Sequence, residues 1–492
     1  MAHIPQAVLD QMRTLPGLTI RNDGKVRRSY NLPGRPHLML PYVTDRISIR
    51  DFVLPFTVPQ KGEILNALSI FLTTEIIQSI CETDLVTFGN AMDEYVPNEL
   101  KGDVDYQKRS TVVKLLTPAN IEAIARIGLT GSGYKEYEKT GMVNVHRLPP
   151  GLRDGDLLPF PIFDPTTKAD VGHDKRISAD EVARTHGHKV ERLTLQLAQA
   201  IYTYGLTRGA LFFDTKFEWS VDENGILVLT DEKGTCDSSR WALLKAWQKA
   251  MDDGTPVTWL DKEYVRKVLD PLVKGLDPEN PADLAKVDAL VIPNVDLVAS
   301  TTTRRYRYLF WLTTGKMLEK FQREDMGIKV DLPRRKIKVI VGSENDMSQI
   351  DASLVLFDGC AEGDVDVISC HRNPEVLRNG AKTGFGGADV VVTCAGKLAA
   401  LAGDTKALLC ENKFEHIPVI GVGLEGDSHD ADQAAILSME QLPGQPVELD
   451  ADGHAYFGPV GVSDAFVAAM EHEFLTKSYT PKPAKLGIRK FS

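Results

Sequence analysis

The pattern of hydrophobic and polar residues becomes regular in the last third of the chain. After residue 336, short β-rich runs alternate with amphipathic, helix-like stretches. The runs cover residues 337–341, 365–369, 389–393 and 418–422, and the stretches cover 346–357, 374–381, 399–409 and 430–439. Strands that alternate with helices are typical of a parallel sheet covered on both faces, so we predict one doubly wound α/β domain over residues 336–476.

The preceding part of the chain has a mixed pattern. Strand-like runs and many turn signals come first, and helix-like runs such as residues 179–204 follow. We predict an α+β domain over residues 1–325, with two lobes that separate near residue 120. The polar stretch 326–335 is a predicted linker, and residues 477–492 a predicted extended tail.

Composition narrows the classes of function. With 492 residues, the chain is long enough for two to four domains. Its 57 Lys and Arg against 68 Asp and Glu give a net charge of −11, so we expect no nucleic-acid or membrane partner. The 6 cysteines form no Cys-x-x-Cys pair, and no apolar run approaches the roughly 20 residues that span a bilayer. We therefore expect a cytoplasmic protein.

One segment of the first domain carries a distinctive set of charges. In the strand-like run 212–219, alternation places Lys216 and Glu218 on the same face. Asn224-Gly225 predicts a two-residue hairpin loop, in a register that makes Glu218 and Asp231 cross-strand neighbours, with Cβ atoms roughly 4.5–5.5 Å apart. Two interpretations stay open: a solvated hairpin, or a Mg²⁺–phosphate site.

Other segments offer weaker phosphate-binding candidates. Asp237, Ser238 and Ser239 precede a helix-like run at 242–251, where they either cap a helix or, with Arg240, form an anion receptor. Further upstream, a glycine precedes Lys25, and a Gly-Ser-Gly sequence around Ser132 follows Arg126. Both arrangements could cradle a phosphate, although most such sequences are only turns.

In the second domain, polar clusters follow three predicted strands. They lie at 342–346, 369–372 and 394–397, and in a doubly wound sheet the carboxyl ends of the strands meet in one crevice. Ser343 and Asp346 could hold ribose or phosphate there, and His371 could act as acid or base. The alternative is that this histidine is an ordinary polar loop residue.

Ten ordered segments of the first domain resemble phosphoribosylaminoimidazole-succinocarboxamide synthase, the SAICAR synthetase family, over nearly all of residues 15–320. They are Gly24-Lys-Val-Arg27, Thr44-Asp-Arg-Ile-Ser48, Lys61-Gly-Glu-Ile-Leu65, Leu129-Thr-Gly-Ser-Gly-Tyr-Lys-Glu-Tyr137, Pro161-Ile-Phe-Asp-Pro-Thr-Thr-Lys168, Gly172-His-Asp174, Asp214-Thr-Lys-Phe-Glu218, Asp231-Glu232, Asp237-Ser-Ser-Arg240 and Asp261-Lys-Glu-Tyr-Val-Arg266. The resemblance implies a two-lobed ATP-binding fold related to ATP-grasp and kinase-like architectures. It also implies an ATP-dependent ligase of purine biosynthesis that joins L-aspartate to a carboxyaminoimidazole ribonucleotide through an acyl phosphate.

The same resemblance implies roles for individual residues. Lys25 and Lys216 would contact ATP phosphates, with Lys216 catalytic, and Glu218 and Asp231 would hold Mg²⁺. The chain near Glu122 would present backbone to adenine. Arg126, Ser132 and Arg240 would bind the ribonucleotide phosphate, and Asp237, Ser238 and Ser239 would help place the second substrate.

Two departures concern the glycine-loop side of the site. Arg28 stands where the family usually has Asp, and Ile49-Arg50 replace Ala-Phe before Asp51.

The second domain resembles aminoimidazole ribonucleotide (AIR) carboxylase or its carboxyamino mutase relative, over roughly residues 336–476, which implies a flavodoxin-like sheet. The matching patterns are Gly-Ser-x-x-Asp at 342–346 and Ser-x-His-Arg-x-Pro at 369–374. The implied site comprises the catalytic His371 and the substrate-binding Ser343, Asp346, Ser369, Arg372 and Lys397.

The implied reaction of this domain is carboxylation of AIR with CO₂ or bicarbonate, in an octamer built on these domains. Lys397-Leu398-Ala399 departs from the sequences of both family branches. The alternative is therefore an inactive or altered domain that serves in oligomerisation or ligand binding.

Overall fold

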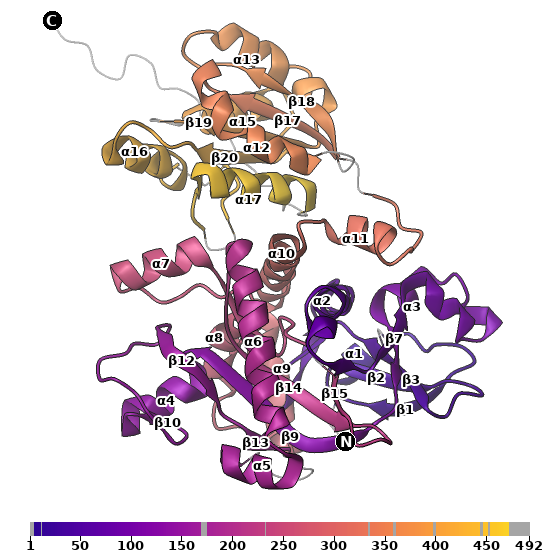
Figure 1. Ribbon diagram of the computed structural model, residues 1–492. Helices are drawn as coiled ribbons and strands as arrows, with labels where there is room; N and C mark the ends of the chain where they lie inside the picture. Colours follow the sequence, from indigo (N-terminus) through magenta and orange to yellow (C-terminus); the bar gives the residue numbers. More distant parts are fainter. Residues whose placement is uncertain are drawn as a thin grey trace, which may run out of the picture. The chain divides into compact units, whose positions relative to one another are not determined.

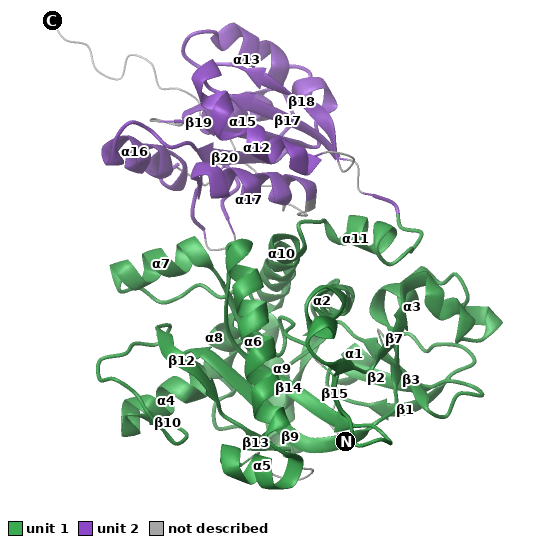
Figure 2. Cartoon of the chain, viewed as in Figure 1, with its two compact units in different colours: residues 1–330 green, residues 331–492 purple. Residues whose placement is uncertain are grey.

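The computed structural model divides the chain into two compact units, residues 1–330 and 331–492 (Figure 2). It describes residues 4–10, 12–168, 175–231, 233–332, 335–357, 361–396, 400–442, 446–450 and 453–471. The predicted tail at 477–492, the 172–174 segment of the resemblance and Lys397 lie outside these described residues.

Unit 1 begins with an antiparallel sheet in the order β1-β2-β3-β8-β7 (Figure 1). Its strands are β1 (Thr19–Asp23), β2 (Arg27–Asn31), β3 (Leu38–Val43), β7 (Leu85–Phe88) and β8 (Thr111–Lys114). Alternate residues of β2 point inward, so that Arg28 and Tyr30 are buried. A small hairpin of β4 (Arg46–Ile49) and β5 (Phe52–Thr57) follows β3.

A second, larger sheet of unit 1 is built around two long antiparallel strands, β9 and β14. Its members are β6 (Glu82–Thr83), β9 (Thr117–Gly128), β12 (Leu157–Phe163), β13 (Thr166–Thr167), β14 (Ala210–Val221), β15 (Leu227–Thr230) and β16 (Ser239–Leu243). The residue near 120 at which the lobes were predicted to separate lies close to the start of β9. A short β10 (Met142–Val143) and β11 (His146–Arg147) pair apart from both sheets.

Helices pack against the strands of unit 1 and complete its core. They are α1 (Gln6–Leu9), α2 (Lys61–Glu75), α3 (Val104–Arg109), α4 (Gly131–Thr140), α5 (Ala179–His186), α6 (Lys189–Thr207), α7 (Leu244–Asp253), α8 (Glu263–Val273), α9 (Pro281–Val291), α10 (Val295–Thr314) and α11 (Leu318–Glu324). Helix α6 packs against β9 and β14 (Figure 1). The predicted helix over 179–204 is in fact α5 followed by α6, because Gly187 between them has a left-handed backbone with φ +82°.

The predicted two-residue hairpin loop after β14 is wrong by one residue. Glu218 pairs with Thr230 rather than Asp231, and the strands meet at Asp222 and Ile226. The carboxylate of Asp222 accepts hydrogen bonds from the backbone N–H of Asn224, at 2.9 Å, and of Ile226, at 2.7 Å. This side chain closes a three-residue loop in which only Gly225 needs a positive φ, of +76°.

The predicted start of a helix at residue 242 is also wrong. Residues Ser239–Leu243 form strand β16, and α7 begins at Leu244. Pairing of β16 with β14, for example Ala242 with Leu211, overrides the local helical pattern. Asp237, Ser238 and Ser239 therefore cap no helix and instead lead into the larger sheet.

Unit 2 is a parallel sheet in the order β18-β17-β19-β20-β21, which confirms the predicted doubly wound fold and is the flavodoxin-like strand order. The strands are β17 (Arg335–Val341), β18 (Ala361–Val367), β19 (Val390–Ala395), β20 (Val419–Gly423) and β21 (Tyr456–Phe457). The helices are α12 (Asp351–Leu354), α13 (Pro374–Ala381), α14 (Gly384–Gly387), α15 (Ala400–Glu411), α16 (His429–Glu440) and α17 (Gly458–Glu471), with short 3₁₀ turns at Glu344–Gln349 and Val355–Phe357. Helices α15 and α17 both pack on β19 and β20.

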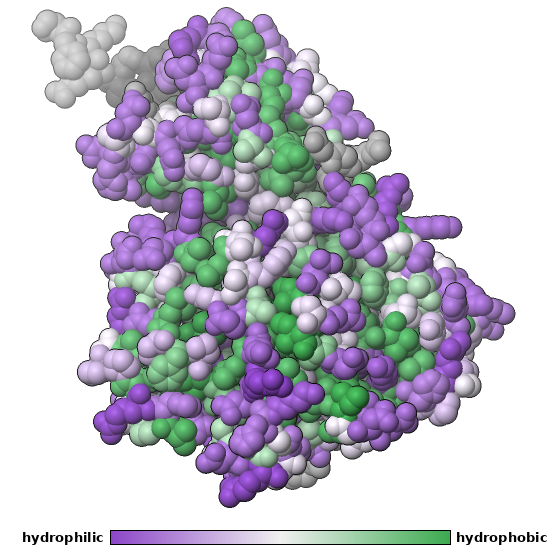
Figure 3. All heavy atoms as spheres, viewed as in Figure 1, coloured by the Kyte–Doolittle hydropathy of each residue, from purple (hydrophilic) through white to green (hydrophobic). Residues whose placement is uncertain are grey.

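The surface of each unit is largely hydrophilic on the face shown in Figure 3, with hydrophobic side chains gathered in smaller patches. Within the described ranges, no helix combines the length and the apolar character needed to cross a membrane.

Candidate active sites

Glu218 lies opposite Thr230, the residue just before Asp231, so the two acidic residues are close in the fold although they are not cross-strand partners. Asp231 follows β15 directly and has a left-handed backbone, with φ +58°. Burial and the neighbouring charge of Asp231 both raise the pKa of Glu218. Burial acts in the same direction on Asp231, but the positive charges of Arg27 and Lys168 outweigh it and lower the pKa of that carboxyl.

Cations surround this pair of carboxylates. Lys168 forms an ion pair with Glu218, and Arg27 forms one with Asp231. Lys216, two residues before Glu218 on β14, forms an ion pair with Glu122. Since these lysines are partly exposed, they could turn from a carboxylate to the phosphates of a ligand.

Glu122 lies in the middle of β9, between β13 and β14. Its carboxylate also accepts a hydrogen bond from the Thr166 hydroxyl, at 3.2 Å. The side chain of Glu122, rather than its backbone, therefore contacts the charged cluster. The role of the nearby chain in binding adenine stays a prediction.

The glycine-loop side of the site accommodates Arg28, one of the two departures from the family pattern. Arg28 is buried and forms an ion pair with Asp23, at 2.5 Å, and the same carboxylate pairs with Arg46 at 2.8 Å. Asp23 thus supplies an acidic partner for both arginines. At the tip of the β4–β5 hairpin, Asp51 has a φ of +69° and forms an ion pair with Lys25.

The predicted phosphate-binding residues Arg126, Ser132 and Arg240 come together around Asp214. Arg126 donates to Ser132 Oγ at 3.0 Å and lies 3.3 Å from Asp214, whose carboxylate is 2.7 Å from Arg240. The sequence around Ser132 is the first turn of helix α4. A side chain at Gly131 would collide with the Arg240 guanidinium, so the glycine lets this helix end approach Arg240.

Asp237 is buried with partners that the sequence did not reveal. Its carboxylate lies 2.7 Å from Lys61 Nζ and accepts a hydrogen bond from the Tyr306 hydroxyl at 2.8 Å. The side chain of Asp237 is 2% exposed and that of Lys61 is 0% exposed. Lys61 opens a segment that the family resemblance included without a role, whereas nothing in the pattern around Tyr306 indicated one.

The neighbouring serines form a short chain of hydroxyls. Ser239 Oγ donates to Thr215 Oγ1 at 2.8 Å, and Ser238 Oγ lies 3.4 Å from Ser239 Oγ. Ser239 begins strand β16, which pairs with β14, and Ser238 comes just before it.

In unit 2, the polar clusters after β17 and β18 meet. The Arg372 guanidinium donates to the carbonyl of Gly342 at 3.1 Å, and the Arg372 backbone N–H donates to Ser369 Oγ at 3.3 Å. Ser343 caps the 3₁₀ turn that carries Asp346. Burial raises the pKa of Asp346, and the nearby charge of Arg372 partly opposes this.

His371 lies in the same loop, exposed to solvent, with its Nδ1 atom 3.4 Å from Cys370 Sγ. The arrangement brings His371, Ser369 and Arg372 to one end of the sheet, beside the end of β17, as the strand order requires. The role of Lys397 remains a prediction because it lies outside the described residues.

The two units match two family models. The model described as SAICAR synthetase matches residues 20–281, and the one described as AIR carboxylase matches residues 336–455. The chain belongs to the SAICAR synthetase family. It is a fusion of two purine-biosynthesis domains, a SAICAR synthetase domain followed by an AIR carboxylase domain. The predicted family, fold and ligase class are confirmed.

Individual SAICAR synthetases agree with this assignment. The chain is 38% identical over 291 residues to the synthase of Xanthomonas euvesicatoria pv. vesicatoria (strain 85-10), which covers 55% of this chain and 90% of the relative. It is 36% identical over 309 residues to the synthase of Thioalkalivibrio sulfidiphilus (strain HL-EbGR7), and the match covers 61% of this chain and 96% of the relative. The solved SAICAR synthase from Saccharomyces cerevisiae complexed with SAICAR superposes with a TM-score of 0.50 at 29% identity, covering 62% of this chain and 98% of that one.

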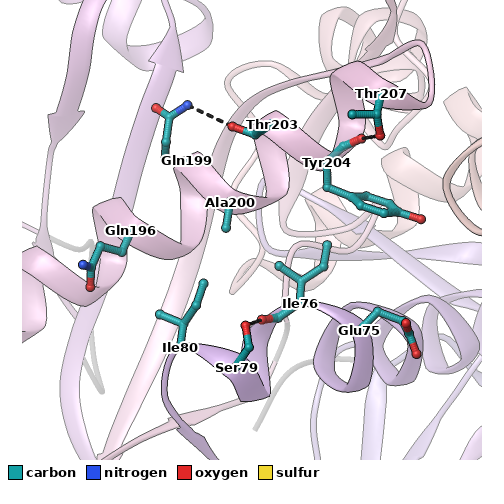
Figure 4. A pocket seen from close by; sticks show the side chains of 10 residues that line it. All are labelled: Glu75, Ile76, Ser79, Ile80, Gln196, Gln199, Ala200, Thr203, Tyr204 and Thr207. Carbon is teal, nitrogen blue, oxygen red and sulfur yellow. Dashed lines mark hydrogen bonds between the residues drawn. The ribbon is translucent and has the colours of Figure 1, made fainter.

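A groove of about 830 Å³ lies elsewhere in the SAICAR synthetase unit (Figure 4). It runs between α6 and the residues that follow α2. Its lining residues are Glu75, Ile76, Ser79, Ile80, Gln196, Gln199, Ala200, Thr203, Tyr204 and Thr207. Since no candidate site residue is among them, the groove is separate from the charged cluster.

Proposed function

We propose that unit 1 binds ATP through Lys25 and Lys216, with Mg²⁺ between Glu218 and Asp231. The observation that carries the proposal is that Glu218 lies opposite Thr230, the residue just before Asp231, and that both acidic residues form ion pairs with cations. Among the residues that the structure describes, no cluster of three or more His, Cys, Asp or Glu side chains could hold a metal. Two carboxylates nevertheless suit Mg²⁺, which usually completes its shell with water and substrate phosphates.

The reaction requires activation of a poor acyl donor. The substrate carboxylate attacks the γ-phosphorus of ATP to form an acyl phosphate and ADP, and the amine of L-aspartate then displaces inorganic phosphate to form the amide, with loss of a proton. Bound Mg²⁺ would neutralise charge on the phosphates. Lys216 would orient the transferred phosphoryl group, since positioning and charge stabilisation supply most of the catalysis of phosphoryl transfer.

The remaining clusters suit the two other substrates. Arg126, Ser132 and Arg240 offer a bidentate guanidinium geometry and a helix N-terminus to the phosphate of the carboxyaminoimidazole ribonucleotide. Lys262 and Lys61 lower the pKa of the buried Asp237, so it stays ionised and would act on the aspartate site by positioning the serines that follow it. Ser238 and Ser239 would complete this aspartate site.

Two substitutions test the metal site directly. Glu218→Gln and Asp231→Asn should each abolish the Mg²⁺-dependent part of ADP binding and lower ligation at least 100-fold. Glu223→Gln is the matched control, because Glu223 lies exposed in the same hairpin and should leave both properties unchanged. Wild-type ligation by either carboxylate variant would refute the proposed metal site.

For unit 2, we propose carboxylation of AIR with CO₂ or bicarbonate, with His371 as the acid or base. Ser343, Asp346, Ser369 and Arg372, together with Lys397, would hold the ribonucleotide. The convergence of polar groups after β17 and β18 supports this proposal. The full chain, supplied with AIR and bicarbonate, should form carboxylated product, and absence of turnover would favour an altered domain.

We also propose that the chain forms an octamer through unit 2. The proposal rests on the family resemblance, and Val355, Val367, Val376 and Leu437 are exposed apolar side chains on this unit. Light scattering of the full chain should give the mass of eight subunits, and a monomer at micromolar concentration would refute the proposed assembly.

A further inference from the structure

We propose that the buried ion pair between Lys233 and Asp84 is a positioning device that holds the metal ligand Asp231 in place. The inference rests on the proposed function, because it concerns the Mg²⁺ site of unit 1. Lys233 Nζ lies 2.8 Å from Asp84 Oδ1, and the side chains of both residues are only 5% exposed. The family resemblance gave neither residue a role.

Asp84 marks the point at which the chain crosses from one sheet of unit 1 to the other. Strand β6, just before it, pairs with β15 in the larger sheet, and β7, just after it, pairs with β8 in the first sheet. The Asp84 N–H donates to the Leu229 carbonyl at 3.2 Å, and its carbonyl accepts from the Lys114 N–H at 2.8 Å. Asp84 is therefore held by the backbones of both sheets.

Lys233 lies two residues beyond the metal ligand. The described backbone has a positive φ at Asp231, of +58°, and at Gly234, of +86°. A glycine adopts such a backbone without strain, and an aspartate adopts it at a modest steric penalty. Strained backbone of this kind persists where the surrounding structure holds it, and it clusters at functional sites.

The side chains of Asp231 and Lys233 have different environments. Asp231 is 40% exposed, in the group of cations, whereas Lys233 is anchored in the interior. An anchor two residues along the chain fixes the direction in which the Asp231 carboxylate points. Because a buried ion pair often adds little net stability over an apolar pair, a geometric role explains its presence better than a stabilising one.

The double variant Asp84→Asn/Lys233→Met tests the inference on the full chain. It removes both charges together and so leaves no unpaired buried ion. ADP affinity measured by calorimetry with Mg²⁺ should fall at least ten-fold, whereas ADP affinity without Mg²⁺ should stay within two-fold of wild type. Hydrogen–deuterium exchange of the backbone around Asp231 should rise. Wild-type affinity with Mg²⁺ and unchanged exchange would overturn the proposal.

A matched control removes a similar pair elsewhere in unit 1. Arg307 and Glu319 lie 2.7 Å apart and are also largely buried. The variant Arg307→Met/Glu319→Gln should leave Mg²⁺-dependent ADP affinity within two-fold of wild type. An equal loss in this control would show that the effect is general destabilisation and would overturn the positioning role.

A single variant separates this inference from the proposed function. If Asp231→Asn retains Mg²⁺-dependent ADP binding, both the metal site and the positioning role fail. If Asp231→Asn loses it but the double variant does not, only the positioning role fails. Should the double variant not fold, Lys233→Arg keeps the buried charge but alters the anchor, and it should weaken Mg²⁺-dependent binding at least three-fold; an unchanged affinity would overturn the proposal.

Discussion

Replacement of Lys61 by Met should destabilise unit 1 and weaken binding of L-aspartate. The change removes a fully buried ammonium group that lies 2.7 Å from the Asp237 carboxylate. Loss of one partner from a buried ion pair costs about 3–5 kcal/mol, because the other charge stays buried without compensation. Asp237 keeps the Tyr306 hydrogen bond, at 2.8 Å, and a more distant Lys262 at 3.7 Å, so we expect the lower end, about 3 kcal/mol.

Urea unfolding followed by tryptophan fluorescence measures this effect in the full chain. All 5 tryptophans lie in unit 1, so the signal reports that unit without a contribution from unit 2. The control is Lys316→Met, which breaks an ion pair with Asp325 that is also 2.7 Å long but partly exposed to solvent. An exposed pair contributes about 0–1 kcal/mol. A loss below about 1 kcal/mol in Lys61→Met would refute the reasoning.

The same variant should become sensitive to acid at a higher pH. Burial acts to raise the pKa of Asp237, but Lys262 and Lys61 outweigh it, and the pKa lies well below its ordinary value. A carboxylate of this kind stabilises the folded state above its unfolded pKa of about 3.9, and the contribution is lost as the pH falls through the folded value. Without Lys61 the pKa of Asp237 rises, so the acid-unfolding midpoint should move to higher pH; an unchanged midpoint would contradict this coupling.

Three further changes have defined outcomes. Gly131→Ala should raise KM for the ribonucleotide at least ten-fold, because the new methyl group meets the Arg240 guanidinium and the residue has a φ of +57°; an unchanged KM would argue against a phosphate site there. His371→Asn should abolish carboxylation and spare ligation in the full chain, and parallel loss of both activities would contradict separate sites. Asp222→Ala should lower the free energy of unfolding by about 1–2 kcal/mol, because two backbone N–H groups lose their acceptor, and tryptophan fluorescence in urea would detect it.

Periodicity and turn residues were enough to predict the architecture of unit 2. Its strands at 335–341 and 390–395 lie within a few residues of the predicted runs, and α13 at Pro374–Ala381 has the predicted bounds. In a doubly wound sheet the ends of neighbouring strands meet, so the contacts around Arg372 followed from the strand pattern. The charged face of β14 was equally visible, because alternation along a strand is a local property.

Features set by contacts between distant parts of the chain could not be predicted. The register at Glu218 depends on the Asp222 side chain, and residues 239–243 form a strand only because β14 lies beside them. Lys61, at the start of α2, meets Asp237, just before β16, and Asp84 meets Lys233 where the chain crosses from the larger sheet to the first one. Local patterns specify which face of an element is apolar, but the partner of a buried charge depends on how the elements pack, and that information is spread over the whole chain.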